Sequence, residues 1–172
     1  PTPRLQGRLK LNPLVHIDTM GMFFLLLLGF GWGKPVEFDP YNLKDPRKDA
    51  AFISIAGPSS NFILAIVLAL LLKLFIILQL NFLIIIGSLI FAPVIRMNIM
   101  LGIFNLLPIH PMDGFKIVEG ILPVEKAREW KGLQRYGMIF LILLIFPIAG
   151  SSMLNGILQP IIEFISNLLI MV

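Results

Sequence analysis

The sequence has 172 residues, a length that allows one domain, and a formal net charge of +4 from 14 basic and 10 acidic residues. Hydrophobic residues make up 57% of it and charged residues only 14%, which excludes an ordinary water-soluble domain. Cysteine is absent, so any metal would need histidine and carboxylate ligands. We therefore expect an all-α integral membrane protein. Its positive charge reports on orientation in the bilayer, and no nucleic-acid partner is expected.

The first 40 residues predict short elements beside the membrane. Polar and apolar residues alternate over 8–11 and again over 34–40, so we expect two short edge strands in a small sheet. Between them, residues 20–30 are apolar, but as a helix they would cover only ~16 Å of a hydrocarbon core about 30 Å thick. They predict a short re-entrant segment. For His16 and Asp18, which precede it, a structural hydrogen-bonded pair is favoured over metal binding.

Two full membrane spans follow. Residues 52–72 would cover ~31 Å as a helix, and they contain the string A-G-P-S-S-N at 56–61. Proline is tolerated there because hydroxyls and neighbouring helices can satisfy the freed carbonyl. The second span runs over residues 82–107 and is expected to bend near Pro93.

The second span carries polar residues on one face. Asn98, Gly102 and Asn105 share that face by helical spacing. For Asn98, hydrogen bonding between helices and a role in a site remain equally open. Arg96 needs a partner or an aqueous crevice, and the sequence does not identify that partner.

The rest of the chain predicts a surface segment and further apolar helix. Residues 115–135 are amphipathic and basic, as in a segment at a membrane surface. Residues 136–148 form a short third span, and 154–172 place Gln159, Glu163 and Ser166 on one face of an interfacial or packed helix. No repeat or linker interrupts the chain, so residues 1–172 are expected to form a single membrane-embedded domain.

The basic residues predict the orientation. If residues 20–30 dip into the membrane and return, twelve of the fourteen basic residues lie on the side that holds the turn after the second span. Only Lys73 lies on the far side, and Arg96 lies within a span. The positive-inside rule then makes the side of Asp113 cytoplasmic, in the plasma membrane.

The string N-L-L-P-I-H-P-M-D-G, from Asn105 to Gly114, ends the second span. A carboxylate at the mouth of a membrane-length segment is costly and therefore indicates a functional site. This string resembles the third motif of the site-2 protease family, whose members are zinc metalloproteases that cut within the membrane, and A-G-P-S-S-N is similar to the family's second motif. The resemblance implies that Asp113 is a ligand of Zn²⁺ and that Asn105 lines the site and donates to the oxyanion.

The family's other two ligands and its general base come from an H-E-x-x-H helix, which this sequence does not contain. We expect that helix to precede Pro1, so that the metalloprotease-like domain of residues 1–172 is N-terminally incomplete. A site built from His16, His110 and Asp113 alone is disfavoured, because no carboxylate is placed as the base. Two residues depart from the family's pattern near the ligand: His110, where proline is frequent, and Phe115, where a small residue is frequent.

The resemblance implies an intramembrane zinc metalloprotease that hydrolyses peptide bonds in or near transmembrane segments of membrane proteins. Its partners would be a transmembrane protein substrate and the lipid bilayer, and its oligomeric state stays open. The edge strand at 36–39 could hold the extended substrate by strand addition. Two other functions remain: a non-catalytic membrane scaffold of the same fold that lacks the metal-binding helix, and a small transporter or channel component with a polar path through Arg96, Asn98 and Asp113.

Overall fold

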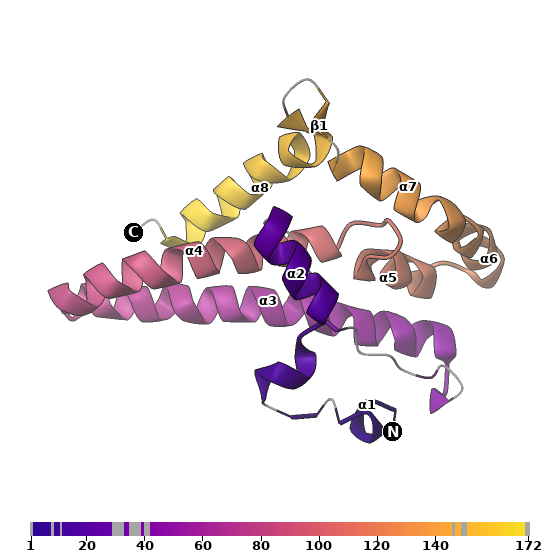
Figure 1. Cartoon of the computed structure of the whole chain (residues 1–172), viewed down its shortest axis with the longest axis horizontal. Helices are drawn as coiled ribbons and strands as arrows, with labels where there is room; N and C mark the ends of the chain where they lie inside the picture. The colour runs from indigo at the N-terminus through magenta and orange to yellow at the C-terminus, as the bar shows by residue number, and fades with distance from the viewer. Residues whose placement is uncertain are drawn as a thin grey trace. The chain divides into compact units, whose positions relative to one another are not determined.

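The computed structural model describes residues 2–7, 9–10, 12–28, 33–34, 39, 42–145, 147–148 and 151–170. Most of these residues are helical, in agreement with the predicted class (Figure 1). The chain separates into two compact units, Pro1–Pro46 and Arg47–Val172.

The first unit contains short helices. α1 spans Thr2–Leu5, a single 3-10 turn spans Pro13–His16, and α2 spans Thr19–Leu28. The 3-10 turn begins at Asn12, whose side-chain oxygen accepts from the Leu14 N–H at 3.0 Å. This contact satisfies one of the free donors at the start of the turn. The ten residues of α2 match the apolar part of the expected re-entrant segment, and its return through the membrane remains a prediction.

His16 and Asp18 are each held by the backbone. His16 Nε2 lies 2.9 Å from the Lys10 carbonyl oxygen, and Asp18 Oδ1 accepts from the Gly21 N–H at 2.8 Å. These contacts favour the structural interpretation of both side chains over a metal site. Between the two residues, Ile17 forms an isolated antiparallel bridge with Gly33.

The two predicted edge strands lie largely outside the described part of the chain. Residues 8 and 11 of the first strand are not described, nor are residues 35–38 and 40 of the second. Both strands, and the substrate-binding role expected for residues 36–39, therefore remain predictions.

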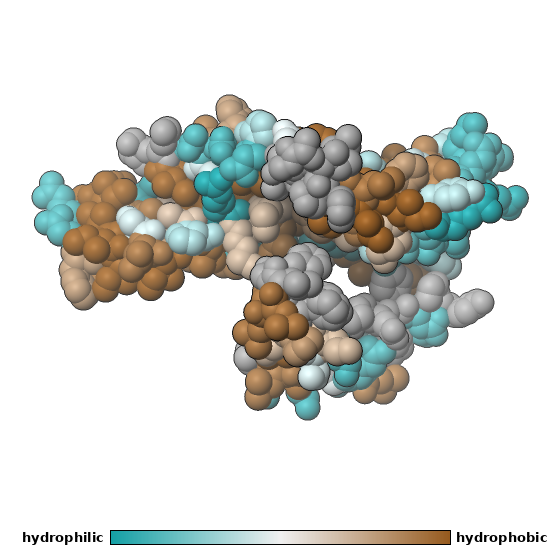
Figure 2. All heavy atoms as spheres, turned by 45° about the horizontal axis from the view of Figure 1, so that its top comes forward, coloured by the Kyte–Doolittle hydropathy of each residue, from teal (hydrophilic) through white to brown (hydrophobic). Residues whose placement is uncertain are grey.

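The second unit is built on a hairpin of two long helices, α3 at Pro46–Ile77 and α4 at Asn81–Asn105 (Figure 1). The turn between them includes Gln79 in a left-handed conformation, with φ of 56°. Both helices are long and apolar enough to cross a membrane. Only 17% of the apolar window of each is buried inside the protein, whereas the core helix of a soluble protein would be mostly buried. Figure 2 shows hydrophobic residues over most of the visible surface of this hairpin.

Small residues let the two helices approach each other. A Cβ atom at Gly102 of α4 would lie 2.8 Å from Cζ of Phe62, which α3 contributes. Next to this contact is a core shared by three helices, the third being α8 at Met153–Ile170. Its buried residues combine small and large side chains, as close packing requires: Ala65, Ala69, Ile95, Ile99, Leu158 and Ile162.

Shorter elements connect α4 to α8. They are α5 at Asp113–Ile121, α6 at Val124–Gly132, α7 at Gln134–Ile145, and an antiparallel pair of two-residue strands, β1 at Pro147–Ile148 and β2 at Ser151–Ser152. α7 has 12 residues and a length of about 18 Å, less than a bilayer core requires. The third span expected over residues 136–148 therefore remains a prediction.

The structure supplies the partner of Arg96 that the sequence could not identify. Nη2 of Arg96 lies 3.7 Å from Oε1 of Glu163 in α8, and Gln159 donates to the same carboxylate oxygen at 2.7 Å. The two charged side chains are 52% and 53% exposed, so the pair lies on the outer face of the two helices. Ser166, expected on the same face as Glu163, is instead buried.

Candidate metal-ligand site

Asp113 is the first residue of α5 and lies against α3. The chain enters α5 through Met112 in extended conformation, with φ of −66° and ψ of 157°. The Ser54 hydroxyl of α3 hydrogen-bonds to the Asp113 carboxylate, and a Cβ atom at Gly57 would lie only 3.1 Å from Asp113 Oδ2. The fold therefore brings the aspartate of the second half of the chain to the Ala-Gly-Pro segment of α3.

α5 then runs antiparallel to the first turns of α3. A Cβ atom at Gly120 would overlap the side chain of Ala51. After α5 ends, the Leu122 carbonyl accepts a 2.6 Å hydrogen bond from Nη1 of Arg47. Asp113 thus lies at one end of the contact between α3 and α5, and the hydrogen bond of Arg47 lies at the other end.

Asn105 is the last residue of α4 and is half-buried. The first turn of α5 lies directly against the residues that follow Asn105, because a Cβ atom at Gly114 would overlap the carbonyl oxygens of Leu106 and Leu107. Glycine is needed at this position by the close approach of the two backbones. The contact is between Gly114, which follows Asp113, and Leu106 and Leu107, which follow Asn105. Asp113 and Asn105 are the two site residues predicted from the sequence.

Asn98 has a structural partner within its own helix. It is buried, and its Nδ2 donates to the Val94 carbonyl at 2.8 Å. Of the three residues expected to share one face of α4, Asn98 and Gly102 are buried, and Gly102 packs against Phe62 of α3. The bonded partner of Asn98 therefore favours a structural role for this residue.

An aromatic cluster supports the turn that carries Asp113. Phe115, 4% exposed, stacks on Trp130 of α6 at 5.2 Å between ring centroids, and it meets the His110 ring edge-on at 5.6 Å. Trp130 Nε1 donates to the Phe115 carbonyl at 3.0 Å. The two residues that depart from the family's pattern, His110 and Phe115, thus contact each other.

Sequence reasoning missed Ser54 and Trp130. Ser54 is a hydroxyl two residues before the Ala-Gly-Pro string in an apolar helix, and its position one helical turn before Gly57 is the signal that could have identified it. Trp130 has no comparable signal, because its contacts come from a segment 15 residues away in the chain.

The electrostatics of the turn reflect its burial. Burial raises the pKa of Asp113, while the nearby Lys116 charge and the Ser54 hydrogen bond act in the opposite direction. Burial and the same lysine lower the pKa of His110 below its usual value. A carboxylate of raised pKa gains from a nearby cation, since a metal ion favours the ionised form.

The described residues fit only part of a zinc site. Asp113 is a suitable oxygen ligand. Within the described ranges, however, no three histidine, cysteine, aspartate or glutamate side chains are close enough together to hold a metal ion. The role of Asp113 as a zinc ligand therefore stays a prediction.

Comparison with known proteins identifies the family of the chain. Residues 78–145, which include Asn105 and Asp113, match peptidase family M50. The protein named "Putative zinc metalloprotease YwhC" of Bacillus subtilis is 36% identical over 172 residues, which cover 96% of this chain and 78% of that protein. The protein named "Zinc metalloprotease MJ0392" of Methanocaldococcus jannaschii is 39% identical over 79 residues, 46% of this chain and 22% of that protein. No solved structure gives a significant match. The chain belongs to peptidase family M50, the site-2 proteases.

Proposed function

We propose that the complete protein is an intramembrane zinc metalloprotease that hydrolyses peptide bonds in or near transmembrane segments of membrane proteins. The observation that carries this proposal is the depth of Asp113 along α3. Asp49 is the last charged residue of α3 before Lys73. Ser54 and Gly57, against which Asp113 lies, come five and eight residues later, which is ~8 and ~12 Å further along the helix.

This depth supports hydrolysis below the headgroup level. The uncharged stretch between Asp49 and Lys73 is ~35 Å long, close to the thickness of a hydrocarbon core. A carboxylate one-quarter to one-third of the way along it can meet peptide bonds that water at the membrane surface does not reach. α5 leads from that depth back to the charged first turn of α3, where Gly120 packs on Ala51 and Arg47 donates to the Leu122 carbonyl.

Zinc, when bound, would supply a Lewis acid and lower the pKa of a bound water. Asp113 would hold the metal, and the Ser54 hydroxyl would orient the Asp113 carboxylate through their hydrogen bond. Asn105, half-buried at the end of α4, would donate its amide to the substrate carbonyl oxygen as negative charge develops there. We propose that the two remaining ligands and the general base come from an H-E-x-x-H helix outside this sequence.

The positive charge supports a cytoplasmic location for the Asp113 side of the membrane, with the protein in the plasma membrane. The substrates would be transmembrane proteins whose helices unwind near the site. Residues 36–39 would hold the unwound segment by strand addition.

The test compares the full-length protein with Asp113→Ala, measuring bound zinc and cleavage of a transmembrane substrate. We expect wild type to hold one zinc per protein and the variant to lose both zinc and cleavage. Glu125→Ala, which removes an exposed carboxylate from α6, is the matched control and should retain both. Full zinc content in Asp113→Ala would show that the assignment of the ligand is wrong.

A non-catalytic scaffold is the second candidate, because the described residues do not gather a complete ligand set. It predicts that wild-type full-length protein binds no stoichiometric zinc and cleaves no substrate. The same zinc measurement therefore separates the two candidates.

A further inference from the structure

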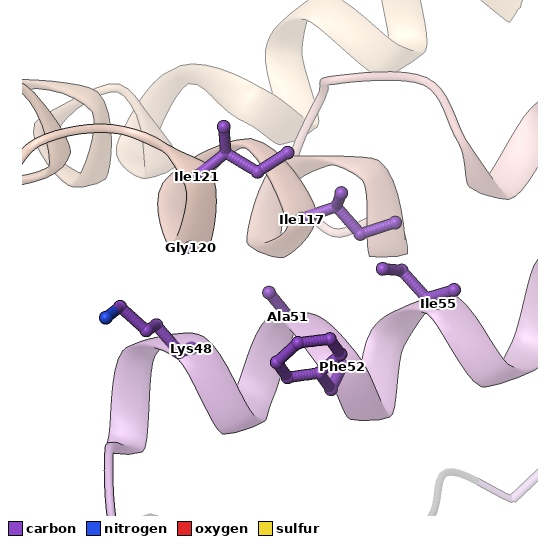
Figure 3. Close-up of a pocket in the computed structure, with 7 residues that line it drawn as sticks. All are labelled: Lys48, Ala51, Phe52, Ile55, Ile117, Gly120 and Ile121. Atoms are coloured by element: carbon purple, nitrogen blue, oxygen red, sulfur yellow. The ribbon is translucent and has the colours of Figure 1, made fainter.

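One face of α5, the helix that begins with Asp113, makes small contacts with α3. Asp113 bonds to Ser54 at the start of α5. Gly120, seven residues later and on the same face of the helix, packs on Ala51. Figure 3 shows α5 along this part of α3, with Ala51 directed toward the ribbon of α5.

The packing of α5 on α3 is incomplete. The two helices leave a groove of about 180 Å³, whose lining includes Ile55 of α3 and Ile117 of α5 (Figure 3). Protein interiors contain few voids larger than a water molecule, and side chains beside a void lack the contacts that would hold them. The contacts with α3 alone therefore leave α5 room to rotate about its own axis.

Trp130 of α6 holds the opposite face of α5. Two residues along an α-helix are ~200° apart around its axis, so Phe115 faces away from the side that Asp113 turns toward α3. The Phe115 ring stacks on Trp130 at 5.2 Å between centroids, and the Phe115 carbonyl oxygen accepts from Trp130 Nε1 at 3.0 Å. One contact fixes the side chain and the other fixes the backbone, so together they resist rotation of α5.

α7 holds the loop that leads into α5. The His110 ring meets Phe115 edge-on at 5.6 Å, and a Cβ atom at Gly137 of α7 would overlap the backbone of His110. Gln134, the first residue of α7, has its Nε2 atom 3.5 Å from Nε2 of His110. α6 and α7 therefore contact the chain on both sides of Asp113, at Phe115 and at His110.

We infer that Trp130 is a positioning residue for Asp113. Its contacts with Phe115 set the rotation of α5 about its axis and so keep the Asp113 carboxylate directed at Ser54. The purpose of this role rests on the proposed function, because a fixed carboxylate serves a protein whose Asp113 binds zinc. Trp130 acts through α5 and is not itself a ligand.

The first experiment measures the position of residue 113 in metal-free full-length protein. The sequence contains no cysteine, so Ser54→Cys with Asp113→Cys places a pair of thiols at two positions that bond in the structure. Diamide oxidises such a pair to a disulfide when the two sulfurs can meet. We expect Trp130→Ala to slow this oxidation about tenfold, the shift in an equilibrium that the lost stack and hydrogen bond together represent. Trp130→Phe keeps the ring stack and should restore part of the rate.

Leu158→Ala is the matched control for a general loss of stability. It removes a buried side chain from the core shared by α3, α4 and α8, and should lower the thermal midpoint as Trp130→Ala does. The rate of disulfide formation should nevertheless stay at the value of the parent pair. An equal slowing in Leu158→Ala would show that stability alone sets the rate, which would overturn the inference.

The second experiment measures zinc affinity with Ser54 and Asp113 intact. Trp130→Ala should bind zinc about tenfold more weakly, as expected when a contact that orients a ligand is lost, and Trp130→Phe should lie between it and wild type. Asp113→Ala separates this inference from the proposed function. If that variant keeps its zinc, the ligand assignment is wrong, and the disulfide rates still decide whether Trp130 holds α5. An unchanged disulfide rate in Trp130→Ala would overturn the inference, as would a slower rate with wild-type zinc affinity.

Discussion

At the scale of single residues, Ser54 and Asp113 form the contact on which the candidate site depends. The two residues are 59 positions apart and belong to different helices, yet the hydroxyl of one bonds the carboxylate of the other. Ser54 is 3% exposed, so water does not replace it easily as a partner. The contact fixes the direction of the carboxylate before any metal arrives.

Replacing Ser54 with alanine should weaken zinc binding by the full-length protein. Loss of a residue that orients a metal ligand costs about 10–100-fold in metal affinity. Zinc affinity can be measured by competition with a chelating dye. Ser60→Ala is the matched control, since the Ser60 hydroxyl bonds the Gly57 carbonyl of the same helix at 2.7 Å and does not contact the carboxylate. Equal zinc affinity in both variants would show that the hydroxyl does not position Asp113.

Gly114 should tolerate no side chain. In Gly114→Ala the new Cβ atom overlaps the carbonyl oxygens of Leu106 and Leu107, and forcing such an overlap costs about 1–3 kcal/mol of stability. Gly132→Ala is the control, because a Cβ atom there meets no other atom within 4 Å and alanine favours the helix. Thermal unfolding in detergent should separate the two. A neutral Gly114→Ala would mean that the backbone after α4 and the first turn of α5 do not approach so closely.

The sequence allowed some of the candidate site residues to be predicted and left others unidentified. Asp113 and Asn105 could be selected because a recurring motif contains them, and the structure brings the residues that follow Asn105 against the first turn of α5. Ser54 was missed because one hydroxyl in an apolar helix has many ordinary explanations. The stacking of Trp130 on Phe115 depends on how α6 folds back on α5, and local patterns carry no information about that return.

At the scale of elements, the sequence predicted the apolar parts of the two long helices, α3 and α4, more closely than their ends. α3 begins at Pro46 rather than near residue 52, because Pro46 suits the first turn of a helix and the charged residues that follow continue it at headgroup depth. α4, at Asn81–Asn105, lies within two residues of the expected bounds. Hydropathy reports where a helix meets lipid and not where its hydrogen bonds begin, which explains the difference.

The ion pair of Arg96 with Glu163 should hold α8 against α4. The half-exposed Arg96 of Glu163→Gln is expected to face lipid without its carboxylate partner. A charge at the centre of a span costs about 2.5–3.5 kcal/mol on insertion scales, and one near its ends costs less. The double variant Arg96→Gln with Glu163→Gln removes both charges and should recover part of that stability. Unfolding in lipid nanodiscs measures the difference.

A matched control for this pair is Glu129→Gln, which breaks the exposed contact of Lys126 with Glu129 at 3.1 Å on α6. Such surface pairs contribute about 0–1 kcal/mol, so this variant should unfold nearly as wild type does. If the double variant is no more stable than Glu163→Gln alone, the two charges do not act as a pair in the membrane.

At the scale of the whole molecule, the hairpin of α3 and α4 relates the proposed depth of Asp113 in the membrane to the orientation of the chain across it. The charged first turn of α3, the turn that carries Asp113 and the basic helix α6 all belong to the same end of this hairpin, since α5 returns from Asp113 to Arg47. The turn at residues 78–80 is the opposite end. A single choice of orientation therefore places the candidate site and seven of the nine basic residues of Arg47–Val172 on one side of the bilayer.

The absence of cysteine makes that choice directly measurable. We expect a cysteine introduced at Glu125, on exposed α6, to react with a membrane-impermeant maleimide only when the reagent reaches the cytoplasmic face. A cysteine at Asn81, the exposed first residue of α4, should react only from the opposite face, because α3 and α4 are each long and apolar enough to cross a membrane and are expected to do so once. Labelling both positions in intact cells and in inverted vesicles gives four measurements with opposite patterns for the two positions. Reaction of both cysteines from one side would show that the hairpin does not span the bilayer, and the reverse pattern would place Asp113 on the outer side.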